Sequence, residues 1–388
     1  MRIMHISRAA ETLSRFLTPT MIEQKRLGHY VCVCVAQGQD ELVGNKNVSA
    51  AEHLRKAGIE VFTYNLRRST NPVGILKAIL RVKRLLVEQR IEALVCHTPL
   101  CSAVGRIAAR LAKTPHVIYF AHGLTCAPAQ GFFSWQLRYW AEKLLGSITD
   151  AIIVMNDYDE KLCRTHHIIK NPEKIFRIPG IGVDLSRYNP DSSEQAKNQL
   201  AAELSISKDW KIVLFVGRMI YEKGAMVLAE AVKRILAQRD DVCSIFVGRG
   251  PLTDEIQKLA ETGKIASHFK LVGWREDVFI MMKAADIFVL PTYYYEGLPV
   301  SILEAMACSK PVVATQHRGC EDVVVDGQTG FLVPVKQAEP LADKLLLLLD
   351  DEQLRRKMGQ AGRLRVEQHF ELSYCTKKIA EALEKAIG

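Results

Sequence analysis

Short apolar runs separated by stretches of helical periodicity constrain the fold of this 388-residue chain most strongly. Such runs are typical of strands buried on both faces, and the spacing between them leaves room for crossover helices. We predict strands at 3–6, 31–35, 60–64, 93–96, 116–120, 151–154 and 175–178, and, after the pattern restarts, at 211–216, 242–247, 269–272, 287–290 and 311–314. The fold class is therefore α/β, with two parallel sheets covered by helices.

The segment 184–209 is rich in Asn, Pro, Ser and charged residues, which is typical of a linker that leads into a short helix. We therefore expect an N-terminal domain at 1–189 and a C-terminal domain at 190–366. The final stretch, 367–388, is predicted to be a helical tail that packs across the domains.

Composition narrows the class of protein. Hydrophobic residues make up 48% of the chain and charged residues 24%, as in folded globular proteins. No uncharged apolar run is long enough to span a bilayer, and the N-terminus lacks the apolar segment of a signal peptide, so we expect a cytoplasmic protein. The ten cysteines form no C-x-x-C pair and are expected to be small core residues; a catalytic thiol at Cys96 or Cys101 is disfavoured.

The net charge of +9 arises in the first half of the chain. Residues 1–189 contain 26 Lys and Arg against 15 Asp and Glu, whereas residues 190–388 contain 26 against 28. This asymmetry predicts an anionic partner for the first half: nucleic acid, an acidic membrane surface or a phosphorylated substrate.

The segment 295–307 follows a predicted strand and opens a helix. Gly297 permits a tight turn, Pro299 suits the first helical turn, and the free N–H groups from Val300 onward form a site for a diphosphate. Glu296 and Glu304 can each accept hydrogen bonds from a pair of sugar hydroxyls. The alternative is a solvated loop acid and a surface helix acid.

Two glycine turns follow the first two predicted strands of the second half. Gly217 allows a turn that places Arg218 and Lys223 at the carboxyl end of the sheet, where two cations suit a diphosphate leaving group, although a solvated turn is the ordinary alternative. Gly248 lies in a Gly-x-Gly-Pro turn that does not match a dinucleotide fingerprint, and we expect it to shape a loop beside the nucleotide.

His122 directly follows the predicted strand 116–120. Its imidazole is expected at the carboxyl edge of the first sheet, where it can contact a sugar hydroxyl. The alternative is a loop histidine that is hydrogen-bonded to the backbone.

In combination, these motifs resemble glycosyltransferase family 4, whose members have two Rossmann-like domains facing each other across a cleft (the GT-B architecture) and retain the anomeric configuration. The resemblance covers the second half almost throughout. It rests on Gly217-Arg218, Glu222-Lys223-Gly224, Glu296-Gly297-Leu298-Pro299, Glu304-Ala305-Met306-Ala307, and the segments 310–315, 319–324 and 326–333.

The resemblance implies a role for each motif residue. Arg218 and Lys223 would hold the donor pyrophosphate, Glu296 the transferred sugar and Glu304 the ribose. Gly217, Gly248, Gly297, Leu298 and Val300 would line the donor site, and His122 would act with Arg218, Lys223 and Glu296 in catalysis.

The first half resembles the branch that builds bacterial capsule, exopolysaccharide or lipid-linked oligosaccharide. The similarity lies in the segments 67–72 and 97–99 and in His122-Gly123. Ser7-Arg8-Ala9-Ala10 replaces the usual Gly-Gly pair after the first strand, and Ile181 replaces the usual Asn in the linker motif. The implied partners are a nucleotide-sugar donor, most simply a UDP-sugar, and a saccharide acceptor on a lipid diphosphate carrier, without nucleic acid.

No pair of carboxylates suggests a covalent sugar–enzyme intermediate, since Glu296 and Glu304 have binding roles. The resemblance implies instead that the leaving diphosphate helps to deprotonate the acceptor on the same face of the sugar. We expect no metal and no cofactor, because Arg218, Lys223 and helix N–H groups supply the positive charge.

Two alternatives remain at this stage. A nucleotide-sugar epimerase on the same architecture would form product from the donor alone. A nucleic-acid-binding protein is suggested by the basic first half, which carries no recognisable base-reading motif.

Two stretches of the first half suggest a membrane-facing acceptor side. In 75–89, Leu76, Ile79, Leu80 and Leu86 form a helical apolar stripe, with Lys77, Arg81 and Arg84 expected on the opposite face. In 132–140, Trp135 and Trp140 accompany Arg138, a combination that suits lipid headgroups. The alternative is that the aromatic rings pack in the core and the cations are solvated.

Overall fold

The computed structural model describes all residues except 38–40, 67–70, 127–131 and 262–266, and within 41–48, 132–134 and 260–261 only the backbone. The chain forms two compact units: unit 1 is Met1–Ile181 with Ser373–Gly388, and unit 2 is Gly182–Leu372. The chain thus passes between the units twice, at residues 181–182 and 372–373, whereas the sequence placed the domain boundary near residue 190 and the start of the helical tail at residue 367.

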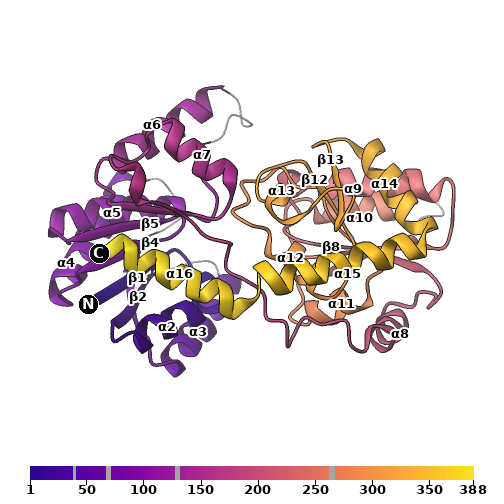
Figure 1. The fold of residues 1–388 in the computed structure, drawn as a ribbon, viewed down its shortest axis with the longest axis horizontal. Coiled ribbons are helices and arrows are strands. Elements are labelled where there is room, and N and C mark those ends of the chain that lie inside the picture. The colour runs from indigo at the N-terminus through magenta and orange to yellow at the C-terminus, as the bar shows by residue number, and fades with distance from the viewer. Residues whose placement is uncertain (38–40, 67–70, 127–131, 262–266) are drawn as a thin grey trace. The chain divides into compact units, whose positions relative to one another are not determined.

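Unit 1 contains a parallel sheet of seven strands in the order β3-β2-β1-β4-β5-β6-β7 (Figure 1). All seven strands expected in the first half are confirmed. They are β1 (Arg2–Ser7), β2 (Tyr30–Gln37), β3 (Glu60–Asn65), β4 (Ala93–Cys96), β5 (His116–Phe120), β6 (Ala151–Val154) and β7 (Ile175–Arg177). The helices are α1 (Ala10–Phe16), α2 (Thr18–Arg26), α3 (Glu41–Lys56), α4 (Pro72–Glu88), α5 (Pro99–Ala112), α6 (Phe132–Gly146), α7 (Asp157–Thr165) and α16 (Leu372–Ile387).

The C-terminal helix α16 belongs to unit 1 from Ser373 onward. Glu384 Oε1 lies 2.9 Å from His29 Nε2, and Lys174 Nζ donates to the carbonyl of Lys385 at 2.9 Å. The last helix therefore ties its end to two places in unit 1 that are distant in the sequence.

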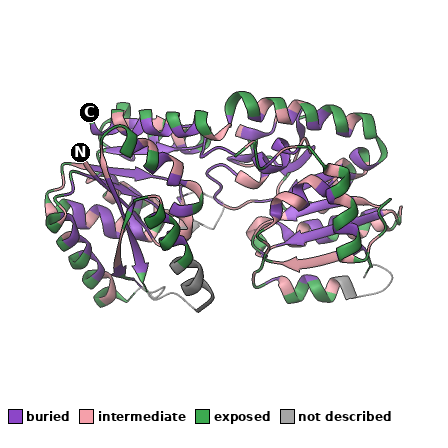
Figure 2. Ribbon diagram, turned by 90° about the horizontal axis from the view of Figure 1, so that it is seen from below, coloured by how far each residue is buried: buried purple, intermediate pink, exposed green. Residues whose placement is uncertain are grey.

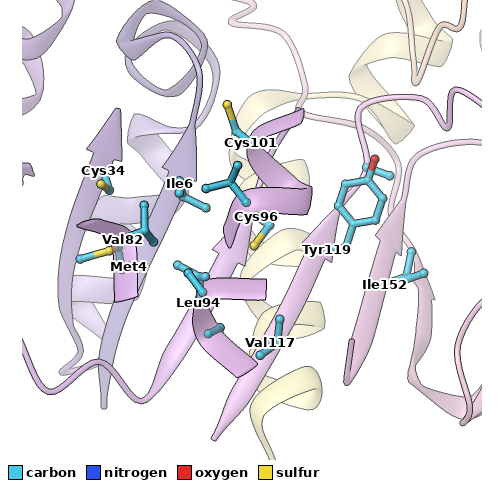
Figure 3. Close-up of a cluster of buried hydrophobic side chains, with 14 of the residues drawn as sticks. Met4, Ile6, Cys34, Val82, Leu94, Cys96, Cys101, Val117, Tyr119 and Ile152 are labelled. Carbon is cyan, nitrogen blue, oxygen red and sulfur yellow. The ribbon is translucent and has the colours of Figure 1, made fainter. Parts of the chain in front are cut away.

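The core of unit 1 lies between its sheet and helices α4 and α5. Figure 3 shows strand residues such as Met4, Leu94 and Ile152 lining one cluster with Val82 of α4 and Cys101 of α5. All ten cysteines of the chain are free and buried, so their prediction as core residues is confirmed.

Unit 2 contains a parallel sheet of six strands in the order β10-β9-β8-β11-β12-β13. The five expected strands are confirmed as β8 (Lys211–Val216), β9 (Val242–Val247), β10 (Phe269–Gly273), β11 (Ile287–Leu290) and β12 (Val312–Thr315); the sequence analysis did not identify β13 (Gly330–Val333). The helices are α8 (Ser193–Leu204), α9 (Ala225–Leu236), α10 (Thr253–Glu261), α11 (Val278–Ala284), α12 (Val300–Ala307), α13 (Cys320–Val323), α14 (Ala338–Asp350) and α15 (Glu352–His369).

In both units most strands are buried, whereas the edge strands β3 and β10 are half-buried, and the helices turn exposed faces outward (Figure 2). The strand order reverses between β1 and β4 in unit 1 and between β8 and β11 in unit 2. Open parallel sheets bind ligands at the carboxyl ends of the strands next to such a reversal. Among the described helices, none combines the length and apolar character needed to cross a bilayer.

Candidate functional site

The loops after β8 and β9 lie backbone against backbone. Gly217 N donates to the carbonyl of Val247 at 3.0 Å. At Gly248, φ is +135° and an added Cβ would lie 1.9 Å from the carbonyl oxygen of Gly217, so no other residue fits there. Gly217 itself has no positive φ, and the conformation that demands glycine therefore lies at Gly248.

The loop after β8 also packs against the end of β11. Gly224, with φ +77°, leaves no room for a Cβ, which would lie 2.0 Å from the carbonyl oxygen of Pro291. Glu222 O accepts hydrogen bonds from Tyr293 N at 2.7 Å and from Thr292 Oγ1 at 3.1 Å. These contacts hold the two loops of the strand reversal together.

Three predicted residues meet where these loops touch. Lys223 Nζ lies 2.5 Å from Glu296 Oε1, and Thr292 Oγ1 donates to the same carboxylate oxygen at 3.0 Å. Two cations lie within cation–π range of the Tyr294 ring. The Arg218 guanidinium is 4.8 Å from the ring centroid, and Lys223 Nζ is 5.3 Å from it. We call Arg218, Lys223, Thr292, Tyr294 and Glu296 the switch-point cluster.

The ion pair in this cluster is shielded from water. The Lys223 side chain is 16% exposed and that of Glu296 is 9% exposed. Two charges in a partly desolvated environment interact more strongly with each other than the two charges of a surface ion pair.

Helix α12 begins beside the cluster. Pro299 is its N-cap, so the first helical residue is Val300, and the first N–H groups have no intrahelical acceptor. Gly297 and the buried Leu298 lead into this helix, and Glu304 in its second turn is only 6% exposed. The alternative of a solvated surface acid is therefore wrong for Glu304.

The loop after β12 packs against the segment that contains Glu296 and Gly297. At Gly319, φ is +78° and an added Cβ would lie 2.9 Å from the carbonyl oxygen of Gly297. His317 Nε2 donates to the carbonyl of Tyr294 at 3.0 Å, and burial lowers the pKa of His317. Arg318, which is 3% exposed, lies 5.0 Å from the ring centroid of Tyr295.

Thr292, Tyr294, His317 and Arg318 were not predicted as site residues. A signal was available for the last two, because they follow the end of β12 within three residues and thus lie at the same sheet edge as the other loops. Thr292 and Tyr294 acquire their roles only through contact with Glu296, Lys223 and Arg218.

In unit 1, His122 lies just beyond β5 as expected. Its Nε2 is 3.0 Å from His97 Nδ1, and burial lowers the pKa of His122 to about 4, so that the ring is neutral at pH 7. Cys96 is fully buried and burial raises its pKa to about 12, which leaves the thiol protonated and disfavours catalysis by it. Of the motif at 67–72, residues 67–70 lie outside the described part of the chain.

The expected faces of α4 are corrected. Ile79 and Leu86 pack in the core, but Leu76 and Leu80 are 56% and 52% exposed. The reason is that α4 has more apolar residues than its contact with the sheet can cover. Its outer face therefore alternates apolar and basic side chains: Val73, Leu76, Lys77, Leu80, Arg81, Arg84 and Val87.

Helix α6 also presents apolar side chains to solvent. Leu137, Trp140 and Leu144 are 75%, 57% and 69% exposed and lie at helical spacing on one face. Trp135 and Arg138 are half-buried, and the Trp135 ring stacks on Tyr139 at 5.8 Å. The alternative that the aromatic rings pack in the core is therefore confirmed in part for Trp135 and is wrong for Trp140.

Each unit matches a family model. Residues 14–179 match the model described as Glycosyl transferase 4-like domain, and residues 196–365 match the model described as Glycosyl transferases group 1. Together the two matches cover most of the chain, and each falls within one unit.

Similar proteins act on lipid-bearing acceptors according to their names. The N,N'-diacetylbacillosaminyl-diphospho-undecaprenol alpha-1,3-N-acetylgalactosaminyltransferase of Campylobacter jejuni is 29% identical over 366 residues, 93% of this chain and 92% of that protein. The phosphatidyl-myo-inositol mannosyltransferase of Mycobacterium leprae is 31% identical over 287 residues, 73% of this chain and 70% of that protein.

The fold is also found in solved structures. The crystal structure of Anabaena Alr3699/HepE in complex with UDP and glucose has a TM-score of 0.82 at 19% identity, covering 99% of this chain and 100% of that chain. At this identity the similarity shows the shared architecture of two parallel-sheet α/β domains.

Proposed function

The chain belongs to the group 1 glycosyl transferases, and on this premise we propose that it moves a sugar, with retention, from a UDP-sugar to a saccharide on a lipid diphosphate carrier. The donor class is supported by the UDP in the Anabaena structure and the acceptor class by the diphospho-undecaprenol acceptor named for the Campylobacter relative. We further propose that the protein acts in assembly of a surface polysaccharide or glycan at the inner face of the cytoplasmic membrane, a role supported by the acceptor named for the Campylobacter relative.

The observation that carries the proposal is the contact between Lys223 and Glu296. In a nucleotide-sugar, the anomeric carbon is bonded directly to an oxygen of the second phosphate. A cation that holds this phosphate and a carboxylate that holds the sugar must therefore be neighbours, as these two side chains are. Arg218, whose guanidinium lies 4.8 Å from the centroid of the Tyr294 ring, extends the positive region toward the first phosphate.

The proposed reaction uses these side chains as follows. The bond from the anomeric carbon to the phosphate oxygen breaks, and the acceptor oxygen bonds to the anomeric carbon on the same face of the sugar. The acceptor's proton passes to an oxygen of the leaving diphosphate. Arg218, Lys223 and the first N–H groups of α12 stabilise the negative charge that develops on the diphosphate, so the proposal requires no metal and no cofactor.

The donor class is tested by thermal shift with UDP, GDP, ADP and UDP-sugars. A ligand that binds only the folded protein raises its melting temperature by mass action. We expect stabilisation by UDP and UDP-sugars. Stabilisation by none of these ligands would contradict the donor site, and a product formed from the UDP-sugar without any acceptor would identify an epimerase instead.

We predict different effects for the two acidic residues of the donor site. Glu304→Ala should weaken binding of bare UDP, because Glu304 holds the ribose. Glu296→Ala should leave UDP binding within about twofold and instead lower transfer, because Glu296 holds the sugar. Isothermal titration calorimetry with UDP measures the first effect, and a transfer assay measures the second.

Glu321→Ala is the matched control, since Glu321 is an exposed carboxylate on α13 in the same unit. Glu321→Ala should change neither the affinity for UDP nor the rate of transfer. Equal losses of UDP affinity in Glu296→Ala and Glu304→Ala would refute the division of roles.

The outer faces of α4 and α6 support a membrane-bound acceptor. On α4, Lys77, Arg81 and Arg84 lie on the same exposed face as Leu76 and Leu80, so cations and apolar side chains can contact a bilayer together. Each exposed cation contributes about 1 kcal/mol at an anionic leaflet, and salt reduces this contribution.

We therefore predict salt-sensitive binding of the full chain to anionic phospholipid vesicles. The double variant Arg81→Glu/Arg84→Glu should lower the bound fraction severalfold in co-sedimentation, and Trp140→Ser should lower it without changing the salt dependence. Arg234→Glu, at an exposed position of α9 in unit 2, is the control and should bind normally. Equal binding to neutral and anionic vesicles would contradict the prediction.

A further inference from the structure

Three histidines of unit 1 form a continuous hydrogen-bonded chain. His5 lies within β1, His97 just after β4 and His122 just after β5. His5 Nδ1 is 3.0 Å from His97 Nε2, and His97 Nδ1 is 3.0 Å from His122 Nε2. At the inner end, His5 Nε2 is 2.9 Å from Oε1 of Gln24 on α2.

The hydrogen-bonded chain of histidines is closed to water at the end formed by Gln24 and His5. His5 is 1% exposed and His97 and Gln24 are fully buried, whereas His122 keeps partial exposure. Phe120 covers the outer part of the chain, with its ring centroid 5.2 Å from that of His97 and 5.0 Å from that of His122. Only the last imidazole can therefore meet a substrate.

All three rings are neutral at pH 7. Burial lowers the pKa of His5 and of His122 to about 4 and lowers the pKa of His97 well below its ordinary value. A neutral imidazole has one N–H donor and one bare nitrogen acceptor. Each hydrogen bond between two of these rings therefore contains one proton. The direction of one hydrogen bond fixes the direction of the next, because each ring can donate only once.

The orientation of the Gln24 amide sets the direction of every link. Because Gln24 Oε1 accepts from His5 Nε2–H, His5 Nδ1 is bare and accepts from His97 Nε2–H. His97 Nδ1 is then bare in turn and accepts from His122 Nε2–H. His122 is left with a bare Nδ1, which is an acceptor for a hydroxyl group.

We infer that Gln24, His5 and His97 are positioning residues that hold His122 in the tautomer whose Nδ1 accepts a hydrogen bond from a sugar hydroxyl of the substrate. The inference rests on the proposed function for the identity of the substrate, but the tautomer itself is a property of the free protein. If the Gln24 amide were reversed, every link would reverse and Nδ1 of His122 would become a donor.

The tautomer is measured by long-range ¹H–¹⁵N NMR of the full chain labelled in histidine, with His122→Gln used to assign the His122 signals. We expect a pyridine-type Nδ1 and a pyrrole-type Nε2 for His122. Gln24→Leu removes the acceptor that polarises the chain, so the His122 signals should move toward the average of the two tautomers. His5→Leu breaks the chain one link further along and should have the same effect.

His53→Gln is the matched control, because His53 is hydrogen-bonded to Ser14 Oγ at 2.9 Å in the same unit, outside the chain of three. It should leave the His122 signals unchanged. In the transfer assay, Gln24→Leu should lower kcat/KM at least twofold, because only the molecules with the correct His122 tautomer can accept the hydrogen bond from the substrate hydroxyl.

A pyrrole-type Nδ1 at His122 in the unmodified protein, or unchanged His122 signals in both Gln24→Leu and His5→Leu, would overturn the inference. These outcomes are independent of the proposed function, because the spectra are recorded without substrate. Conversely, failure of every transfer assay with the expected spectra would contradict the function and leave the hydrogen-bonded chain in place.

Discussion

Replacing Lys223 or Arg218 by alanine is expected to lower kcat by about 10²- to 10³-fold, the loss seen when a single donor to a developing negative charge is removed from an enzyme site. Both cations approach the Tyr294 ring, and Lys223 also contacts Glu296. Since the Glu296 carboxylate is largely buried, Lys223→Ala also leaves it with one fewer partner, and the loss should be at the upper end of the range.

The measurement is single-turnover transfer from a UDP-sugar, together with the melting temperature of each variant. Lys233→Ala is the control, because Lys233 forms only a partly exposed pair with Glu230 on α9 at 3.5 Å. It should retain full activity. Near-normal kcat in both Arg218→Ala and Lys223→Ala would remove the basis of the proposed donor site.

Glu142→Ala is expected to destabilise unit 1 by about 3–5 kcal/mol, because it leaves a buried charge without its partner. Arg106 is fully buried, and its Nη2 donates to Glu142 Oε2 at 2.9 Å. Its guanidinium also lies 4.3 Å from the ring centroid of Tyr119. The Tyr119 ring, which remains in contact, cannot neutralise the positive charge of Arg106.

Chemical denaturation with a spectroscopic signal from unit 1 measures this effect. The double variant Arg106→Leu/Glu142→Leu should be clearly more stable than Glu142→Ala, since it removes both charges. Glu88→Ala, which breaks the exposed Arg84–Glu88 pair, should cost about 0.5 kcal/mol or less. If Glu142→Ala lowered the free energy of unfolding as little as Glu88→Ala, the Arg106–Glu142 ion pair would not be needed to stabilise the buried Arg106.

Twelve of the strands were predictable from apolar runs. Helices cover both faces of a parallel sheet, so its strands are nearly continuous runs of apolar residues rather than alternating apolar and polar residues. β13 was missed because its four residues, Gly330–Val333, follow directly on a turn and include a glycine. The faces of α4 were misassigned at Leu76 and Leu80 for another reason. Periodicity shows that a helix has an apolar side, but not how wide a strip the neighbouring sheet covers.

The sequence alone determined the fold class, the family and the residue types of the proposed donor site. These depend on local patterns: strand length, glycine turns at strand ends, and the Glu296 and Glu304 motif beside a helix start. Local patterns do not show which side chains meet. Lys223 and Glu296 are 73 residues apart and come together because β8 and β11 are neighbours in the sheet.

The tertiary structure alone decided the contacts that give these residues their chemistry. His5 is an ordinary strand residue in the sequence, and Gln24 an ordinary helix residue. Sheet pairing of β1 with β4 and of β4 with β5 brings His5, His97 and His122 into line, and α2 adds Gln24 at the inner end. Burial then keeps all three rings neutral, which is the physical reason that one amide can set the tautomer of a histidine two imidazoles away.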